Sequence, residues 1–240
     1  MKKLILTAAI LGLSAGVAAA QTVRMGTEGA YPPYNFIDDN GEVAGFEREL
    51  GDKLCEMESL DCTWVTNDWD SIIPNLLSGN YDTIMAGMSI TAEREKTIDF
   101  TQAYYPPAAS SYMAMDPGAD LKGGVIAAQT GTIQAAHVAE TGATLAEYAT
   151  LDDTIAAVKN GEADAVFADK DALKPFAGQD NMEFVGDDVQ LGKGIGIGLR
   201  KSDTELKDKF NDGISKLKAD GTLNELLKKY FGDDALTFKN

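Results

Sequence analysis

Short apolar runs alternate with amphipathic stretches along most of the chain, and this alternation predicts an α/β fold. In the first half, apolar runs predict strands at residues 22–26, 62–66 and 82–86. Apolar residues at helical spacing predict a helix over residues 45–58. A second helix is predicted to begin with Asp70 as its N-cap and to end at residue 77, before a glycine.

The second half of the chain repeats this alternation. Its predicted strands span residues 125–128, 145–148, 163–168 and 182–185, and its predicted helices span residues 133–140 and 152–159. In each half, one strand stops at a small, polar turn that opens a helix. Ligands of open α/β sheets bind at such carboxyl ends of strands, so both halves are expected to contribute to one site.

Two stretches rich in proline or glycine separate the halves. The first covers residues 104–111, and the second alternates glycine with aliphatic residues over 192–200, which predicts a strand. Apolar helical stretches beyond residue 200 would return the chain to the first half. Two crossings make two lobes with a cleft that can hinge. The predicted lobes are residues 21–107 plus 193–240, and residues 108–192.

Residues 1–20 have the layout of a cleaved secretory signal peptide: two lysines, an apolar run and three final alanines. The rest of the chain is therefore expected in the periplasm, and no later segment has the ~20 apolar residues of a membrane span. The chain carries a formal net charge of −17, and residues 21–240, which lack Lys2 and Lys3, carry −19. Such a charge disfavours binding to nucleic acid or to anionic lipid.

The chain has two cysteines, Cys55 and Cys62, and one histidine, His137. An even cysteine count in an exported chain indicates a disulfide that closes a short loop. A metal pair is disfavoured because no histidine lies near the cysteines. His137 lies in a polar, helix-like stretch and is interpreted as a surface residue. The sequence therefore predicts no metal and no cofactor.

Arg94 follows a turn of small residues and a predicted N-cap, Thr91. A guanidinium matches a carboxylate with two parallel N–H groups, which an ammonium cannot do. The backbone amides at a helix start also favour an anion. Together these features predict a seat for a small carboxylate. Taken alone, the stretch is more typical of a surface arginine. The carboxylate seat therefore needs support from other parts of the chain.

With these features in order, the chain resembles the solute-binding proteins of polar amino-acid ABC importers, most of all the lysine/arginine/ornithine- and histidine-binding group. The resemblance runs from Val23 to about Phe231 and implies a two-lobed periplasmic-binding-protein fold with an interlobe ligand cleft. It also implies a Cys55–Cys62 disulfide, a monomer, and a membrane permease as partner. The motifs that carry it are Gly-Thr-Glu-Gly-Ala-Tyr-Pro-Pro-Tyr at 26–34, Gly-Phe-Glu at 45–47, Asn-Asp-Trp-Asp at 67–70, Ser-Ile-Thr at 89–91 with Arg94, and Asp-Gly-Thr at 220–222.

The resemblance implies that both charged ends of an amino acid are bound. Arg94 would bind the α-carboxylate, with backbone amides of Ser89 and of the helix start near Ile133. Asp169, at the end of a predicted strand, would bind the ammonium with the Ser89 hydroxyl and the Gly87 carbonyl. The local alternatives are a Ser89 hydroxyl that bonds its own turn and an Asp169 side chain that caps a helix.

Three further residues are expected to meet the ligand side chain. Tyr31 and Trp69 would stack on its aliphatic stem or guanidinium. Glu28 stands where the group carries a carboxylate that holds the distal cation. The alternatives are ordinary packing for the two aromatic residues and a solvated acid for Glu28. The predicted ligand-binding residues are Glu28, Tyr31, Trp69, Ala86, Gly87, Ser89, Arg94, Gln129, Ile133, Gln134 and Asp169.

The sequence departs from the lysine/arginine/ornithine pattern, which has an aspartate at Glu28 and serines at Ala86 and Gly87. Parts of it also resemble the opine-binding branch, and Gln129 and Gln134 would offer amide groups to a ligand. The prediction is capture of a basic amino acid by lobe closure. The alternatives are an octopine- or nopaline-type opine, or a glutamine-like amino acid.

An enzyme that uses the same cleft, such as cyclohexadienyl dehydratase, is an alternative of a different class. It is disfavoured because the sequence shows no Ser–His pair, no Cys–His pair, no metal set and no cofactor loop. A lone glutamate could still act as a general acid. The sequence therefore predicts a binding protein and not an enzyme.

Overall fold

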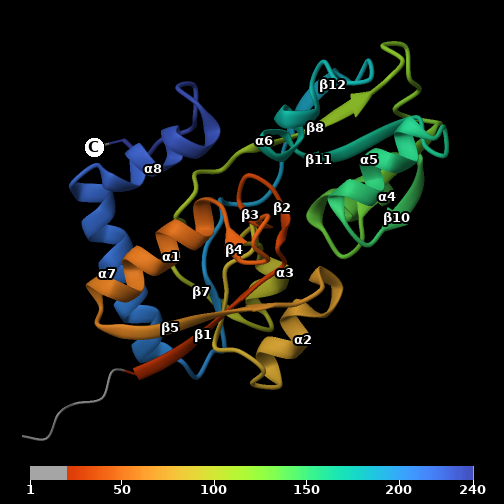
Figure 1. Ribbon diagram of the computed structural model, residues 1–240. Coiled ribbons are helices and arrows are strands. Elements are labelled where there is room, and N and C mark those ends of the chain that lie inside the picture. Colours follow the sequence, from red (N-terminus) through yellow and green to blue (C-terminus); the bar gives the residue numbers. More distant parts are fainter. Residues whose placement is uncertain (1–20, 240) are drawn as a thin grey trace, which may run out of the picture.

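The computed structural model describes residues 21–239, in which two five-stranded sheets form the centres of two lobes (Figure 1). The predicted signal peptide, residues 1–20, lies outside the described residues. We call the part around the sheet that contains residues 21–27 lobe 1, and the part around the sheet that contains residues 125–129 lobe 2. In Figure 1, lobe 1 combines the red-to-yellow and blue parts of the chain, and lobe 2 is mainly green and cyan.

The sheet of lobe 1 has the strand order β5-β1-β6-β13-β7. The central strand β1 pairs in parallel with β5 and with β6, whereas β13 is antiparallel to β6 and β7, so the sheet is mixed. These strands are β1 (Gln21–Thr27), β5 (Leu60–Thr66), β6 (Thr83–Ile84), β7 (Asp99–Phe100) and β13 (Gly198–Leu199). Because β1 and β6 are parallel neighbours, the turns that follow them lie at the same edge of the sheet.

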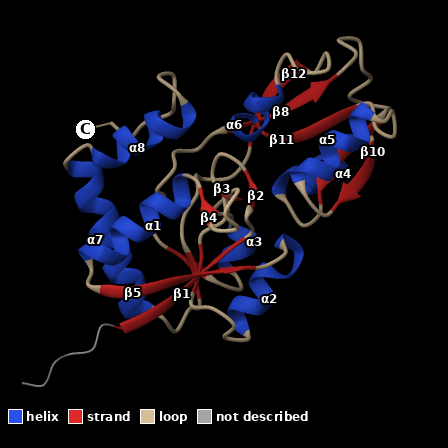
Figure 2. Ribbon diagram, viewed as in Figure 1, coloured by secondary structure: helices blue, strands red, loops and turns tan. Residues whose placement is uncertain are grey.

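The helices of lobe 1 pack their apolar faces against this sheet and against one another. The apolar positions of α1 are buried, and α1 packs against α7 and α8, which lie on the left in the ribbon view (Figure 2). A small antiparallel sheet, β2-β3-β4, was not predicted because its strands are too short to show a period. These elements are α1 (Phe46–Met57), α2 (Ile72–Leu77), α3 (Ala92–Glu95), α7 (Thr204–Ala219), α8 (Thr222–Phe231), β2 (Ala30–Tyr31), β3 (Asn35–Ile37) and β4 (Val43–Ala44).

The sheet of lobe 2 has the order β10-β9-β11-β8-β12 and is also mixed. Two helices, α4 and α5, pack on the strands β9, β10 and β11 (Figure 2). The elements are β8 (Ala109–Ala114), β9 (Val125–Gln129), α4 (Ile133–Thr141), β10 (Thr144–Tyr148), α5 (Leu151–Lys159), β11 (Ala165–Asp169), α6 (Lys170–Leu173), a 3-10 turn (Lys174–Phe176) and β12 (Glu183–Gln190). The predicted two-lobed α/β architecture is confirmed.

The two segments that cross between the lobes run side by side and are hydrogen-bonded to each other. The amide of Ile195 donates to the carbonyl of Tyr105 at 3.1 Å, and the amide of Tyr104 donates to the carbonyl of Ile195 at 2.8 Å. Paired crossing segments of this kind can act as a hinge for closure of the lobes. The lobe boundaries at residues 107/108 and 192/193 stay a prediction.

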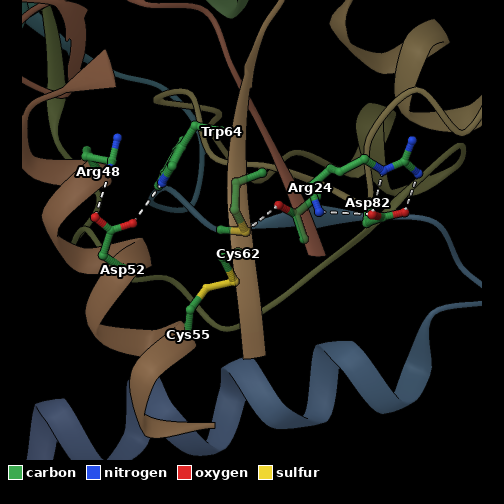
Figure 3. The surroundings of a disulfide bond; sticks show 9 residues. Arg24, Arg48, Asp52, Cys55, Cys62, Trp64 and Asp82 are labelled. Carbon is green, nitrogen blue, oxygen red and sulfur yellow. Dashed lines mark hydrogen bonds and ion pairs between the residues drawn. A yellow bond between two sulfur atoms is a disulfide. The ribbon is translucent and has the colours of Figure 1, made fainter. Parts of the chain in front are cut away.

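The predicted disulfide is confirmed: Cys55, near the end of α1, is bonded to Cys62 in β5, with 6.1 Å between their Cα atoms (Figure 3). The same helix and strand are linked a few residues away, where Trp64 Nε1 donates to Asp52 at 2.9 Å and Asp52 also accepts from Arg48 at 2.6 Å. The bond therefore fastens α1 to the edge of the lobe 1 sheet.

Several local predictions were wrong. Asp70 is not an N-cap, because a 3-10 turn (Trp69–Ser71) precedes α2 and Ser71 holds the N-cap position. Residues 192–200 form a strand only at β13, although Ile195 makes isolated bridges to Ser89 and Tyr105. His137 is half-buried rather than a surface residue, with its ring 5.3 Å from the ring of Phe167.

Within residues 21–239, no group of three or more histidines, cysteines or acids is arranged to hold a metal ion. In the same part of the chain, no helix combines the length and the apolar character needed to span a bilayer.

Candidate functional site

A cavity lies between the lobes and is lined by residues from both. The structure places all eleven residues of the predicted site in its wall, and adds Thr132. The lining residues are Glu28, Tyr31, Trp69, Ala86, Gly87, Ser89 and Arg94 from lobe 1, and Gln129, Thr132, Ile133, Gln134 and Asp169 from lobe 2.

The parallel strands β1 and β6 bring two sets of these residues together. Gly26 of β1 is the register partner of Ile84 of β6, so Glu28 and Ala86 each follow two positions further along adjacent strands. The amide of Met85 donates to the carbonyl of Gly26 at 2.8 Å, which keeps the two strands paired just before they end. The carboxyl edge of the lobe 1 sheet therefore forms one wall of the cavity.

Arg94 is half-buried at the start of α3, where the predicted N-cap is confirmed: the Thr91 hydroxyl accepts from the Arg94 amide at 3.1 Å. The guanidinium donates to the carbonyl of Ser89 at 2.9 Å and, across the cleft, to that of Gly131 at 3.4 Å. It also lies 5.2 Å from the ring centre of Trp69. Burial lowers the pKa of Arg94 to about 10, so the group remains a cation at neutral pH.

Asp169 ends β11 and faces lobe 1 from the other side of the cleft. Its carboxylate accepts a hydrogen bond from the Tyr31 hydroxyl of lobe 1 at 2.8 Å and one from Gln134 Nε2 at 2.9 Å. Burial raises the pKa of Asp169 to about 6, although both hydrogen bonds and the charge of Arg94 oppose the rise. Asp169 occupies the N-cap position of α6 but makes no capping hydrogen bond with its side chain, which leaves the carboxylate directed to the cleft.

Glu28 is half-buried and accepts a hydrogen bond of 2.5 Å from Gln129 Nε2 of lobe 2. The same Gln129 nitrogen donates to the carbonyl of Ala149 at 2.9 Å. Burial raises the pKa of Glu28 to about 7, against the hydrogen bond from Gln129, and the charge of Glu47 adds to the rise. A nearby cation stabilises a carboxylate in this setting more than it stabilises one in water, because the buried charge is poorly solvated.

Two buried aromatic residues form apolar parts of the wall. Trp69 lies in the 3-10 turn before α2, and Tyr31 lies in β2 with its ring 5.6 Å from that of Tyr34. Gly87 has a φ of +62°, and a Cβ atom there would approach the Tyr31 ring to 3.2 Å. A glycine at this position, where the resemblance leads one to expect serine, therefore gives Tyr31 the room to lie against the turn.

The lobe 2 wall is built on the start of α4. The Thr132 hydroxyl accepts from the amide of Ala135 at 3.1 Å and donates to the carbonyl of Gln129 at 2.6 Å. Gln134 is buried and donates to the Ser110 hydroxyl at 3.0 Å as well as to Asp169. Thr132 was missing from the predicted set, although its place in a polar turn before a helix is a sequence signal for a capping residue.

Comparison with known proteins gives a consistent picture. The model of a family described as bacterial extracellular solute-binding proteins, family 3, matches residues 23–233. The L-arginine-binding protein of Pseudomonas aeruginosa is 37% identical over 256 residues, covering 98% of each chain. The lysine/arginine/ornithine-binding periplasmic protein of Escherichia coli is 36% identical over 256 residues, covering 96% of this chain and 97% of that protein.

Among solved structures, the chain is similar to a periplasmic His/Glu/Gln/Arg/opine family-binding protein from Silicibacter pomeroyi in complex with lysine. The two are 66% identical with a TM-score of 0.89, and the match covers 90% of this chain and 100% of that one. Because the match covers 90% of this chain, it includes residues of both lobes.

Proposed function

The chain belongs to the bacterial extracellular solute-binding proteins, family 3, and from this membership we propose that it captures a basic amino acid between its lobes. The captured molecule is passed to the membrane permease of an ABC importer. One observation carries the choice of ligand: the cavity holds a guanidinium in one lobe, a carboxylate in the other, and a second carboxylate, Glu28, beside aromatic residues. This set complements an α-amino acid whose side chain ends in a cation.

In the proposed complex, Arg94 binds the α-carboxylate with its two parallel N–H groups, and Asp169 binds the α-ammonium. The amides of Ser89 and of the α4 start add donors to the carboxylate, and the partial positive charge of that helix end favours it. Since the two groups come from opposite lobes, the zwitterion is fully paired only when the lobes are closed on it. Closure is favoured only by the difference in affinity between the open and closed forms.

The side chain of the ligand lies between Tyr31 and Trp69 and reaches Glu28. The aromatic faces contact its methylene groups, and Glu28 pairs with the distal ammonium or guanidinium. The lysine-bound structure from Silicibacter pomeroyi and the arginine-binding relative support this assignment. Gln129, which donates to Glu28, supplies a further amide for the distal group.

The remaining parts of the proposal follow from the family. The lobes are residues 21–107 plus 193–240 and residues 108–192, the protein acts in the periplasm after cleavage at residue 20, and it works as a monomer. The family and the relatives named above are binding proteins, so we propose that the cavity captures its ligand without converting it. An assay for turnover of prephenate or arogenate would detect the enzymatic alternative.

A ligand screen tests the proposal. Residues 21–240 are purified, and their thermal unfolding is followed with each of the common amino acids, ornithine, octopine, nopaline and other guanidino compounds. Lysine, arginine or ornithine in large excess should stabilise the protein by roughly 3–4 kcal/mol through mass action. A higher unfolding temperature with glutamine or an opine, and an unchanged one with every basic amino acid, would contradict the proposed ligand class.

A further inference from the structure

Glu47 is a fully buried carboxylate that lies outside the cavity wall, in the first turn of α1. It belongs to one of the motifs on which the family resemblance rests, and no role in ligand binding has been assigned to it so far. Burial raises the pKa of Glu47, because its charge is removed from water without a cation as partner. A buried acid in such a setting needs hydrogen-bond donors, and the identity of these donors is informative.

Three uncharged donors from three different segments converge on this carboxylate. Asn35 Nδ2 donates to Oε2 at 2.7 Å, and the backbone amide of Gly87 donates to Oε1 at 2.7 Å. The Tyr104 hydroxyl, at the first crossing between the lobes, donates to Oε1 as well. Asn35 extends the network by one step, since its Oδ1 accepts from the backbone amide of Gly29 at 2.7 Å.

The two amides at the ends of this network occupy equivalent places on neighbouring strands. The amide of Gly29 belongs to the peptide that follows Glu28, and the amide of Gly87 belongs to the peptide that follows Ala86. Glu28 and Ala86 lie in the cavity wall, two residues beyond the last paired positions of β1 and β6. Glu47 and Asn35 therefore fix the orientation of both peptides at the point where the two strands enter the site.

We propose that Glu47 and Asn35 act as a positioning pair that sets the carboxyl ends of β1 and β6 for ligand binding. This inference rests on the proposed function, because it assigns Glu28 and the Gly87 turn to the ligand. Glu47 does not touch the ligand. It aims the Glu28 carboxylate at the distal cation and holds the turn from Gly87 to Ser89 in the shape that receives the zwitterion.

The chemistry of the pair explains why a carboxylate is required at position 47. An ionised carboxylate only accepts hydrogen bonds, which suits a point where three donors meet. A glutamine would keep one acceptor for Gly87 but would turn an NH₂ group toward Asn35. Asn35 would then have to reverse its amide, which would set a donor against the amide of Gly29. A simultaneous aspartate at position 35 removes this conflict, because it accepts both from the glutamine and from Gly29.

The test compares lysine binding by calorimetry in four proteins spanning residues 21–240: the unsubstituted chain, Glu47→Gln, the double variant Asn35→Asp with Glu47→Gln, and Glu49→Gln. The last is a matched control on the same helix, where Glu49 accepts from Lys229 and from the Tyr230 hydroxyl, away from the cavity. Losing a buried hydrogen bond to a charged group predicts about 30-fold weaker binding for Glu47→Gln. The double variant is expected within about threefold of the unsubstituted chain, as is Glu49→Gln, because the donors and acceptors match again.

A spectroscopic readout separates positioning from general stability. The amide ¹H–¹⁵N resonance of Gly29 should shift upfield in Glu47→Gln, where Gly29 loses its acceptor, and return in the double variant. The resonance of Gly87 should shift upfield in both variants, because a neutral carbonyl replaces the carboxylate that accepts from it. Unaltered lysine affinity in folded Glu47→Gln overturns the proposal, and so does a folded double variant that binds as weakly as Glu47→Gln. If Glu47→Gln does not fold, the affinity of the double variant decides alone. Failure of the unsubstituted chain to bind any basic amino acid would instead refute the proposed function.

Discussion

The two walls of the cavity are held in place in different ways. In lobe 1, the peptides that follow Glu28 and Ala86 are fixed through Asn35 and Glu47, and Arg94 follows a helix cap, so the contacts that set the backbone of this wall lie within the lobe. In lobe 2, Asp169 is held by Gln134 of its own lobe and by Tyr31 of the other. The backbone of the lobe 1 wall is therefore set within the lobe, although the side chains of Arg94 and Glu28 also bond to lobe 2. The Asp169 carboxylate of lobe 2, in contrast, has one of its two hydrogen-bond donors, Tyr31, in the other lobe.

Together with the proposed function, this difference predicts an order of events. In the proposed mechanism, a ligand meets the lobe 1 wall first, through Arg94 and the aromatic residues, and gains affinity without a large cost of ordering protein groups. In the same proposal, lobe 2 then closes, and the ligand ammonium pairs with Asp169, to which the Tyr31 hydroxyl donates in this structure. In this proposal, the lobe 2 wall contacts the ligand only in the closed form. The affinity that it adds therefore favours closure.

Two consecutive tyrosines in the first crossing segment also differ in whether they bond within one lobe or between the lobes. Tyr104 donates to Glu47 within lobe 1, whereas Tyr105 donates to the buried Asp171 of lobe 2 at 2.5 Å. The ring of Tyr105 nevertheless packs in lobe 1, 4.8 Å from the ring of Phe231. Tyr105 therefore joins the lobes on the hinge side, and its partner Asp171 lies two residues after Asp169, which lines the cavity.

The strongest way to break the lobe 1 wall is Arg94→Ala. Without the guanidinium, the ligand α-carboxylate would be buried unpaired, at a cost of about 3–5 kcal/mol, so lysine affinity should fall at least about 100-fold. Calorimetry measures the change. Arg48→Ala is the matched control, since Arg48 pairs with Asp52 on the outer face of α1 and should bind normally. Binding by Arg94→Ala within about threefold of the unsubstituted chain would show that the carboxylate is held elsewhere.

The side-chain end of the same wall is tested by Glu28→Gln. The loss of a charged hydrogen bond to the distal cation should weaken lysine binding about 10- to 100-fold. Binding of glutamine, which has no distal charge, should change less than about threefold in the same variant, and competition calorimetry compares the two ligands. Equal losses for lysine and glutamine would mean that Glu28 does not read the side chain.

The pH dependence of selectivity follows from the pKa of Glu28, which burial raises to about 7. A bound cation favours the ionised carboxylate and lowers this pKa, so below pH 7 a proton must leave when lysine binds. Lysine affinity relative to glutamine should therefore fall about tenfold between pH 8 and pH 6. The dependence should vanish in Glu28→Gln. A ratio that stays constant over this range would place the distal cation away from Glu28.

A smaller effect is expected where the lobes are joined behind the cavity. Tyr105→Phe keeps the ring but removes the hydrogen bond to Asp171, so the closed form should lose about 0.5–1.5 kcal/mol and lysine should bind roughly threefold more weakly. Stopped-flow measurement should show the change in the dissociation rate. Tyr230→Phe, which removes a hydrogen bond to Glu49 inside lobe 1, serves as the control and should dissociate at the original rate. Equal rates in both variants would exclude the hinge-side contact from closure.

The sequence predicted the main strands and helices because their apolar positions are long enough to show a period, as in α1 and α7. The residues that the structure gathers around the cavity were predicted from the family resemblance, except Arg94, whose turn and N-cap already indicated a seat for a carboxylate. The resemblance supplied the roles, which remain predictions. Asp70 was wrongly placed because a 3-10 turn has too few residues to be told from a helix start.

Other features could not be predicted because they depend on contacts between distant segments. The β2-β3-β4 sheet has strands of two or three residues, and no period can be read from them. Glu47 looks like an ordinary acid in the first turn of a helix, and only the folded chain shows that Asn35, Gly87 and Tyr104 all donate to it. Glycine and aliphatic residues alternate over 192–200 as in a strand. Gly192 and Gly194, however, have positive φ angles, at the point where the chain crosses between the lobes.

The central claim is that opposite lobes bind the two ends of a zwitterion and that Glu28 binds a cationic tail. A crystal structure of the protein grown with lysine tests this most directly. We expect the lysine carboxylate on Arg94, its α-ammonium on Asp169 and its terminal ammonium on Glu28, each at about 2.7–3.2 Å. A ligand lying with its carboxylate away from Arg94, or with its terminal ammonium in solvent, would contradict the account.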